Sequence, residues 1–108
     1  MENLLVVYVT CGSEEEARRL ASMLVENRLA ACVNVTDVSS VYEWKGKIEN
    51  DREKLLIIKT IEQKFGELEE FVKKNHSYQC PEIIALEVKA GSKEYIEWAN
   101  SVIKADKK

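Results

Sequence analysis

The chain of 108 residues has one histidine, His76, and three cysteines at widely separated positions. A neutral imidazole is the commonest side-chain ligand for transition metals, and a thiolate or carboxylate beside it favours copper or zinc. Cys11 and Glu82 are the candidates to join His76 in such a site. The three do not stand at a recognised ligand spacing, and a lone histidine more often caps a helix or faces solvent. A metal site here therefore depends on the fold bringing them together.

The three cysteines have different expected roles. Cys11 ends an apolar run and precedes a predicted helix N-terminus, where the helix dipole lowers a thiol pKa and makes the thiolate a better ligand or nucleophile. Cys32 lies within a predicted strand, where a cysteine is typically a small buried hydrophobic residue. Cys80, beside a proline, is open to either role. Without a Cys-x-x-Cys pair, the sequence indicates no disulfide framework or structural zinc, and it fits a reducing, cytoplasmic compartment.

Composition disfavours several classes of function. Sixteen basic against nineteen acidic residues give a formal net charge of −3, which offers no basic field to nucleic acid or anionic lipid. The apolar run Leu4 to Val9 is too short for a signal peptide or a membrane helix. No glycine-rich phosphate loop is present, and nothing marks the oxyanion donors that a thiol enzyme needs. We expect a binding or sensing protein, not an enzyme, with neither nucleic acid nor membrane as a partner.

The apolar pattern predicts elements in the order βαββαβα. Leu4 to Cys11 is a continuous β-rich run, the pattern of a central strand. Ser13, with Glu16 three residues later, forms a capping box that begins a helix. Residues 31 to 60 are predicted to form one long hairpin, with a bulge near Asp37 because the apolar positions change parity there.

The rest of the chain supplies two helices and a strand. Apolar side chains at helical spacing mark a second helix, which must end before Pro81; they are Ile61, Phe65, Leu68 and Val72. Residues 82 to 90 are predicted to form the fourth strand. A third amphipathic helix over 95 to 103 precedes a charged tail, 104 to 108.

Repeated β-α-β units with right-handed crossovers have one common compact solution, an α+β ferredoxin-like βαββαβ sandwich. We expect a single domain over residues 1–108 with an antiparallel sheet in the order 4-1-3-2, two helices on one face, an additional C-terminal helix and a long projecting hairpin. In this topology Cys11, the segment Tyr42 to Ile48 and the segment His76 to Glu82 converge at one edge. RNA-recognition modules share the fold, but only Tyr8 offers an aromatic ring on the central strands.

Tyr42 and Trp44 lie near the tip of the predicted hairpin. Two aromatic rings on a projecting tip are costly to leave in water. Either they fold back on their own sheet or they meet a neighbour. We expect the second arrangement, in which another copy of the chain satisfies the exposed hairpin edge in a closed ring.

In combination these motifs resemble the CutA family of divalent-cation tolerance proteins over nearly the whole chain. The motifs are Leu-Ala-Ala-Cys-Val-Asn at 29–34, Tyr-x-Trp-x-Gly-Lys-Ile at 42–48 with Asp51 and Glu53 downstream, His-x-Tyr-x-x-Pro-Glu at 76–82, and Tyr95-x-x-Trp98. The resemblance implies a ferredoxin-like protomer, a homotrimer resembling PII signalling proteins, and a role in tolerance of copper and other divalent metals. It implies no established catalytic activity.

The resemblance also implies a metal site in the clefts between subunits. Its histidine and glutamate match His76 and Glu82, and a cysteine lies near the end of the first strand. That cysteine falls near Val9 in the family pattern, whereas this chain has Cys11 two positions later; strand alternation keeps the side on which it points. The usual His-Pro-Tyr has serine at its centre here, at 76–78. We expect a cytoplasmic homotrimer that binds divalent metal, copper first, at these clefts.

Two other functions remain open. In a PII-like sensor, Lys59, Tyr42, Trp44 and Tyr78 would grip a small anionic or aromatic ligand through charge and stacking. A scaffold role is the third possibility, because some animal relatives are associated with anchoring partner proteins.

Overall fold

A computed structural model describes residues 2–105 of the chain. Its strands and α-helices are β1 (Leu4–Cys11), α1 (Glu14–Glu26), β2 (Cys32–Trp44), β3 (Lys47–Ile61), α2 (Phe65–Asn75), β4 (Ile84–Glu87) and α3 (Lys93–Lys104), with a 3₁₀ turn over Glu62–Lys64 before α2. The order βαββαβα agrees with the pattern predicted from the apolar residues. The end of the predicted charged tail, residues 106–108, lies outside the described residues.

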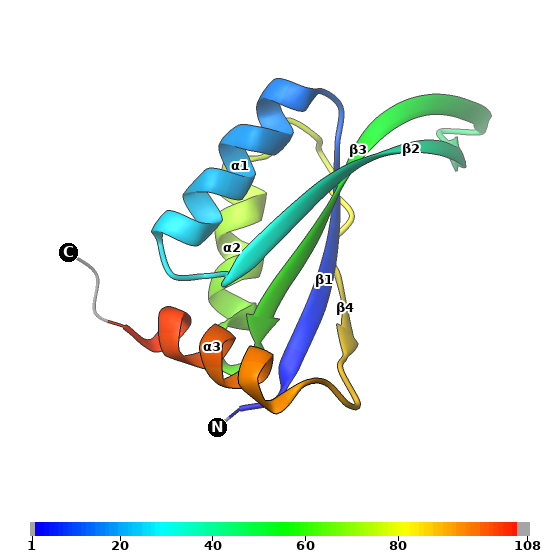
Figure 1. Ribbon diagram of the computed structural model, residues 1–108. Coiled ribbons are helices and arrows are strands. Elements are labelled where there is room, and N and C mark those ends of the chain that lie inside the picture. Colours follow the sequence, from blue (N-terminus) through cyan, green and yellow to red (C-terminus); the bar gives the residue numbers. More distant parts are fainter. Residues whose placement is uncertain (1, 106–108) are drawn as a thin grey trace.

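The strands form one sheet in the order β2-β3-β1-β4, with every neighbouring pair antiparallel. This is the predicted order, and it confirms the ferredoxin-like α+β class. Helices α1 and α2 lie on one side of the sheet and α3 lies beside the lower end of β1 and β3 (Figure 1). Because β1 and β2 run parallel to each other and against β3 and β4, the end of β1, the outer hairpin and the start of β4 share one end of the sheet.

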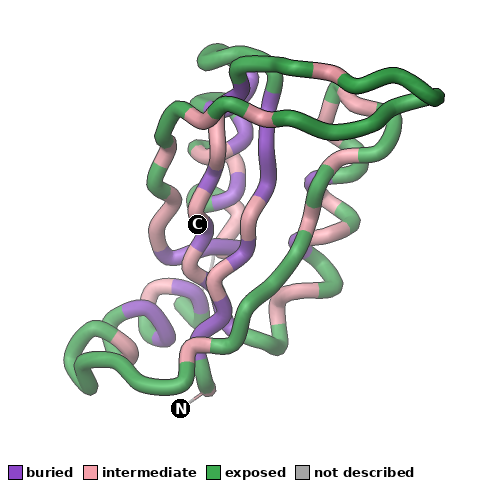
Figure 2. Tube along the Cα trace, turned by 90° about the vertical axis from the view of Figure 1, so that its right-hand side faces the viewer, coloured by how far each residue is buried: buried purple, intermediate pink, exposed green. Residues whose placement is uncertain are grey.

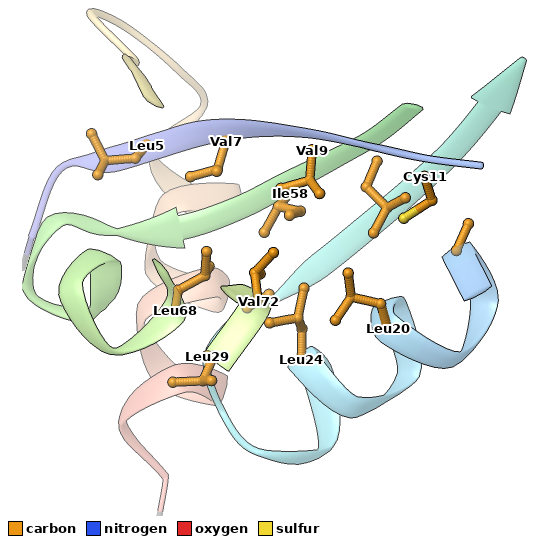
Figure 3. Packing of buried hydrophobic residues seen from close by; sticks show 13 residues of the cluster. Leu5, Val7, Val9, Cys11, Leu20, Leu24, Leu29, Ile58, Leu68 and Val72 are labelled. Atoms are coloured by element: carbon orange, nitrogen blue, oxygen red, sulfur yellow. The ribbon is translucent and has the colours of Figure 1, made fainter. Parts of the chain in front are cut away.

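The main core lies between the sheet and helices α1 and α2. Alternation along β1 directs every second side chain toward the helices, and these side chains pack on leucines of α1 and on Leu68 and Val72 of α2 (Figure 3). A smaller cluster under α3 joins Leu4 and Ile61 to the helix through Ala99 and Ile103. We call the sheet face turned away from α1 and α2 the open face.

The bulge predicted near Asp37 is absent. The β2–β3 register runs without interruption from the pair Cys32 and Lys59 to the pair Trp44 and Lys47. The change of parity has another cause: Val33 packs on the helix-side core, whereas Tyr42 and Trp44, an odd number of residues further on, lie on the open face. The hairpin projects beyond the helices, so its outer half has no core side to select apolar residues.

Three other predicted boundaries or contacts differ in the structure. Ile61, predicted to begin the second helix, ends β3 and is buried under α3. The fourth strand is shorter than residues 82–90, because its pairing with β1 covers only Ile84–Glu87. Ser13 caps α1 by accepting from the Glu16 amide at 3.2 Å, but the Glu16 carboxylate hydrogen-bonds to Ser77 instead of completing the capping box.

The hairpin turn has the backbone conformation that its sequence favours. Lys45 and Gly46 have φ angles of 52° and 82°. Two consecutive positive φ values are typical of the tight hairpin turn whose twist matches that of the strands. The outer hairpin and the segment that carries β4 are exposed along most of their length (Figure 2). Among residues 2–105, no helix has both the length and the apolar character needed to span a bilayer.

Candidate functional site

A cavity of about 730 Å³ opens on the open face, between the outer half of the hairpin and the loop that follows α2; we call it the open-face cleft. Strand alternation supplies most of its floor, which includes Thr10 on β1, Ser40, Tyr42 and Trp44 on β2, and Asp51 and Glu53 on β3; Val41, of the opposite parity, also lines the cleft. The loop 77–80 and Glu82 close one side. The convergence predicted from topology is therefore confirmed for the hairpin and the segment after α2.

Two tyrosines in the cleft are tied to two carboxylates. The Tyr42 hydroxyl donates to Asp51 Oδ2 at 2.5 Å, and the Tyr78 hydroxyl donates to Glu53 Oε2 at 2.8 Å. The hydrogen bond to Asp51 raises the pKa of Tyr42 to about 12, and burial together with the hydrogen bond to Glu53 raises the pKa of Tyr78. Both phenols keep their protons at neutral pH, and both rings are held in place.

Gly12 allows Tyr78 to reach Glu53. A methyl group added at Gly12 would lie 3.0 Å from the Tyr78 hydroxyl oxygen, closer than an ordinary van der Waals contact. A side chain at this position would require the Tyr78 hydroxyl to shift by a few tenths of an ångström, which disturbs its hydrogen bond to Glu53. The glycine thus has a positioning role for the loop that follows α2.

His76 lies behind the cleft with a fully buried side chain. Its Nε2 lies 2.7 Å from the Thr10 carbonyl oxygen, which only accepts, so Nε2–H is the donor. Its Nδ1 accepts from the Tyr78 amide at 3.0 Å. Both ring nitrogens are engaged in this protomer, and the histidine holds the loop against the end of β1.

Cys11 lies next to His76, with its Sγ 3.7 Å from Nε2. The thiol is completely buried at the edge of the main core (Figure 3). Burial, with the nearby Glu16 and Glu53 carboxylates, raises its pKa to about 12. The prediction that the helix dipole lowers this pKa is wrong, because desolvation of the thiolate outweighs the dipole at this depth.

Glu16 anchors the same loop and was not predicted as a site residue. Its carboxylate accepts from the Ser77 amide at 2.7 Å and from the Ser77 hydroxyl at 3.0 Å. Burial alone would raise its pKa, but the hydrogen bonds from the Ser77 amide and hydroxyl outweigh burial and hold the pKa below its ordinary value. In sequence Glu16 has the position of a capping-box acid, and only its tertiary partner reveals the second role.

The structure brings some of the predicted ligands together and separates others. Cys11 and His76 are in contact, whereas Glu82 is exposed and faces the open-face cleft. Within residues 2–105 of one protomer, no three His, Cys, Asp or Glu side chains are grouped so that they would hold a metal ion. A complete metal site would need a rearrangement or ligands from another copy.

Of the residues predicted to grip a small ligand, Tyr42, Trp44 and Tyr78 line the cleft. Lys59 does not: it pairs with Cys32 and Val6 at the far end of β3 and hydrogen-bonds to Asn34. The cleft instead contains carboxyl groups that the strand alternation places there. The sequence indicated Asp51 and Glu53 only as part of a family motif; the hairpin register, which puts them on the same face as Tyr42 and Trp44, is the signal that identifies them.

The fold and the cleft define a class: an α+β ferredoxin-like protein with a long hairpin whose outer half carries an acidic, aromatic cleft. Residues 5–102 match the family model described as "CutA1 divalent ion tolerance protein". The chain belongs to this family.

Relatives and solved structures agree with this assignment. The chain is 50% identical over 95 residues to the chloroplastic protein CutA 1 of Oryza sativa subsp. japonica, covering 87% of this chain and 54% of that protein. It is 48% identical over 94 residues to the divalent-cation tolerance protein CutA of Thermus thermophilus, covering 86% and 91%. The chain thus spans about half the length of the plant relatives that it matches.

The fold matches solved structures from distant organisms. The periplasmic divalent cation tolerance protein CutA of Archaeoglobus fulgidus superposes with a TM-score of 0.90 at 41% identity, covering 96% of this chain and 100% of that one. CutA1 of Oryza sativa gives a TM-score of 0.91 at 46% identity, covering 94% of each chain.

Proposed function

We propose that this protein acts in tolerance of divalent cations, as a non-catalytic cytoplasmic homotrimer that binds divalent metal, with copper as the first candidate, at clefts between subunits. The observation that carries the proposal is the match of nearly the whole chain to the divalent ion tolerance family. Two of the relatives, from Thermus thermophilus and Archaeoglobus fulgidus, bear the name divalent-cation tolerance protein. Three free cysteines are compatible with a reducing compartment.

Exposed apolar side chains support self-association. They gather on β4, with Ile84 and Leu86 about half exposed, and on the hairpin, with Val41 and Ile48 about two thirds exposed. Among residues 2–105, both end strands of the sheet, β2 and β4, also have a side without a strand partner. A closed ring of copies would cover this apolar surface and satisfy the open strand edges.

The candidate metal ligands lie at two different depths relative to the open-face cleft. Glu82 faces the cleft, and the pair of Cys11 and His76 lies behind it. For His76 to bind metal, one ring nitrogen must give up its present hydrogen bond, and Cys11 must lose a proton that burial holds firmly. Metal binding at these residues would therefore release protons and move the loop 77–80. We propose that a second copy completes the ligand set.

The test combines sedimentation and metal analysis on one purified sample after copper addition and desalting. The expected result is a trimer with about one copper per protomer, a load that Glu82→Gln and His76→Ala reduce. Glu87→Gln is the matched control, because it makes the same change at another exposed position of the same segment. Copper that survives both ligand substitutions refutes the ligand set, and a trimer without metal refutes the metal proposal while leaving the assembly.

A second candidate function, a small-ligand sensor, is favoured by the aromatic lining of the open-face cleft. Tyr42, Trp44 and Tyr78 surround a volume in the range typical of small-molecule sites, about 300–1,000 Å³. A thermal-shift screen separates the two functions, because a ligand stabilises the state that binds it. Stabilisation by metals alone favours the first function, and stabilisation by small organic molecules alone favours the second.

A further inference from the structure

We propose that the open-face cleft binds an organic cation, a compound with an ammonium group beside an apolar or aromatic body. This inference deepens the small-ligand function and rests on it; it is independent of the Cys11 and His76 pair. The sequence had indicated an anionic or aromatic ligand because Lys59 was placed in the cleft. In the structure Lys59 does not line the cleft and hydrogen-bonds to Asn34 instead.

The charge of the lining is of one sign. Asp51, Glu53 and Glu82 line the cleft, and no lysine, arginine or histidine is among the described residues that do so. A cleft lined by one sign of charge with low-dielectric walls concentrates ligands of the opposite charge. An anionic ligand would meet repulsion here and would find no basic partner.

Strand alternation produces this separation of charge. Residues 51 to 54 read Asp-Arg-Glu-Lys, so the two acids share one face of β3 and the two bases share the other. Asp51 and Glu53 line the open-face cleft, whereas Lys54 pairs with Asp37 and Glu14 near the start of α1. The bases are held on the opposite side and do not neutralise the cleft acids.

The aromatic rings suit the same ligand. The hydroxyl donors of Tyr42 and Tyr78 are already used by Asp51 and Glu53, which leaves each ring as a fixed, neutral, electron-rich surface. Trp44 is 42% exposed, and the Lys45 ammonium already lies 5.8 Å from the centroid of its ring. An ammonium within about 6 Å of an indole is attracted by the ring quadrupole. Aromatic rings and carboxylates together are the chemistry that recognises organic ammonium groups.

The test uses three probes of similar size and different charge: benzylammonium, benzyl alcohol and benzoate. The chain has two tryptophans, so Trp98→Phe leaves Trp44 as the only indole and its fluorescence reports the cleft. Benzylammonium is expected to bind about tenfold or more tightly than benzyl alcohol, and benzoate more weakly than either. If Trp98→Phe fails to fold, ligand-observed NMR saturation transfer on the unchanged chain makes the same comparison.

A charge substitution and its control locate the site. Asp51→Asn keeps an oxygen acceptor for Tyr42 and removes one cleft charge, so benzylammonium affinity is expected to fall about fivefold. Asp37→Asn removes the same charge from the opposite face of the hairpin and is expected to have little effect. Equal losses in the two variants overturn the proposal, because they indicate only a long-range field.

The same binding measurements distinguish a cleft that selects organic cations from a cleft that binds small ligands of another charge. Preferential binding of benzyl alcohol or benzoate overturns the cation class but retains a small-ligand cleft. If none of the three probes changes Trp44 fluorescence or gives saturation transfer, both the cation class and the small-ligand function are refuted. Copper binding that persists in Asp51→Asn while benzylammonium binding falls assigns the two ligands to different residues.

Discussion

Glu16 is predicted to stabilise the protein chiefly through its charge. Glu16 is only 9% exposed, and its carboxylate accepts two hydrogen bonds from Ser77, at 2.7 and 3.0 Å, beside the buried His76 ring. Glu16→Gln keeps the shape of the side chain and one acceptor oxygen but removes the charge. Glu15→Gln is the matched control, because Glu15 precedes it in the first turn of α1 and is exposed.

The expected loss follows from the number and type of bonds. A hydrogen bond to a charged group contributes about 1.5–3 kcal/mol and a neutral one about 1 kcal/mol, a difference of about 0.5–2 kcal/mol per bond. Two bonds give about 1–4 kcal/mol, and because Ser77 is exposed to water we expect the lower part of that range, about 1–2 kcal/mol, in Glu16→Gln. Glu16→Ala removes both acceptors. Ser77 is exposed, so water replaces part of what is lost, and we expect about 2–3 kcal/mol. Glu15→Gln should change the free energy of unfolding by less than about 0.5 kcal/mol.

The stability difference should depend on pH in a defined direction. The folded protein holds the pKa of Glu16 below the ordinary value of 4.5, so the carboxylate contributes stability that is fully present above that value. The contribution is lost as the pH falls below 4.5 and through the folded pKa. The gap between the native chain and Glu16→Gln is therefore largest at neutral pH and closes in acid.

Denaturant unfolding, followed by circular dichroism at one protein concentration, measures these free energies. The concentration must be held constant because association shifts apparent stability. A Glu16→Gln variant that unfolds together with Glu15→Gln at neutral pH would refute the reasoning. So would a deficit that stays constant as the pH is lowered through the titration of the carboxyl group.

Two further predictions concern other buried groups. Iodoacetamide should modify Cys80 first and leave Cys11 unmodified in the folded protein, because Cys80 is exposed whereas Cys11 is buried with a pKa of about 12. Mass spectrometry checks the order of labelling, and early labelling of Cys11 would contradict its burial. Thr60→Val should lower the free energy of unfolding by about 1–2 kcal/mol, because the buried Thr60 hydroxyl donates to the Leu29 carbonyl at 2.7 Å. Thr36→Val, at an exposed position, is the control; equal stability of the two variants in denaturant unfolding would count against that hydrogen bond.

Local patterns were sufficient for most of the fold. The apolar run of β1, the Ser13 cap and the single long hairpin over residues 31 to 60 each depend on interactions within a few residues or on period-two alternation. Given those elements, handedness and short connections left one common arrangement, and the sheet order followed. The same reasoning correctly placed the end of β1, the hairpin and the loop after α2 at one end of the sheet.

Predictions that depended on the environment of a side chain were less reliable. The parity change near Asp37 was interpreted as a bulge, although it reflects residues on opposite faces of one regular strand. Lys59 was assigned to the cleft, but it lies at the far end of β3. Composition shows neither the face nor the position along a strand, because the face depends on which elements cover the strand and the position depends on the hairpin register.

The amino-acid sequence by itself determined the order of elements, the sheet topology and the family, because these follow from propensity, periodicity and motifs that are local in the chain. Only the tertiary structure decided the chemistry at the end of the sheet. There Glu16 turns from its own helix to Ser77, burial keeps the proton on Cys11, and Tyr42 and Tyr78 are bonded to Asp51 and Glu53. Each of these outcomes depends on desolvation and on partners distant in sequence, which act only when the chain has folded.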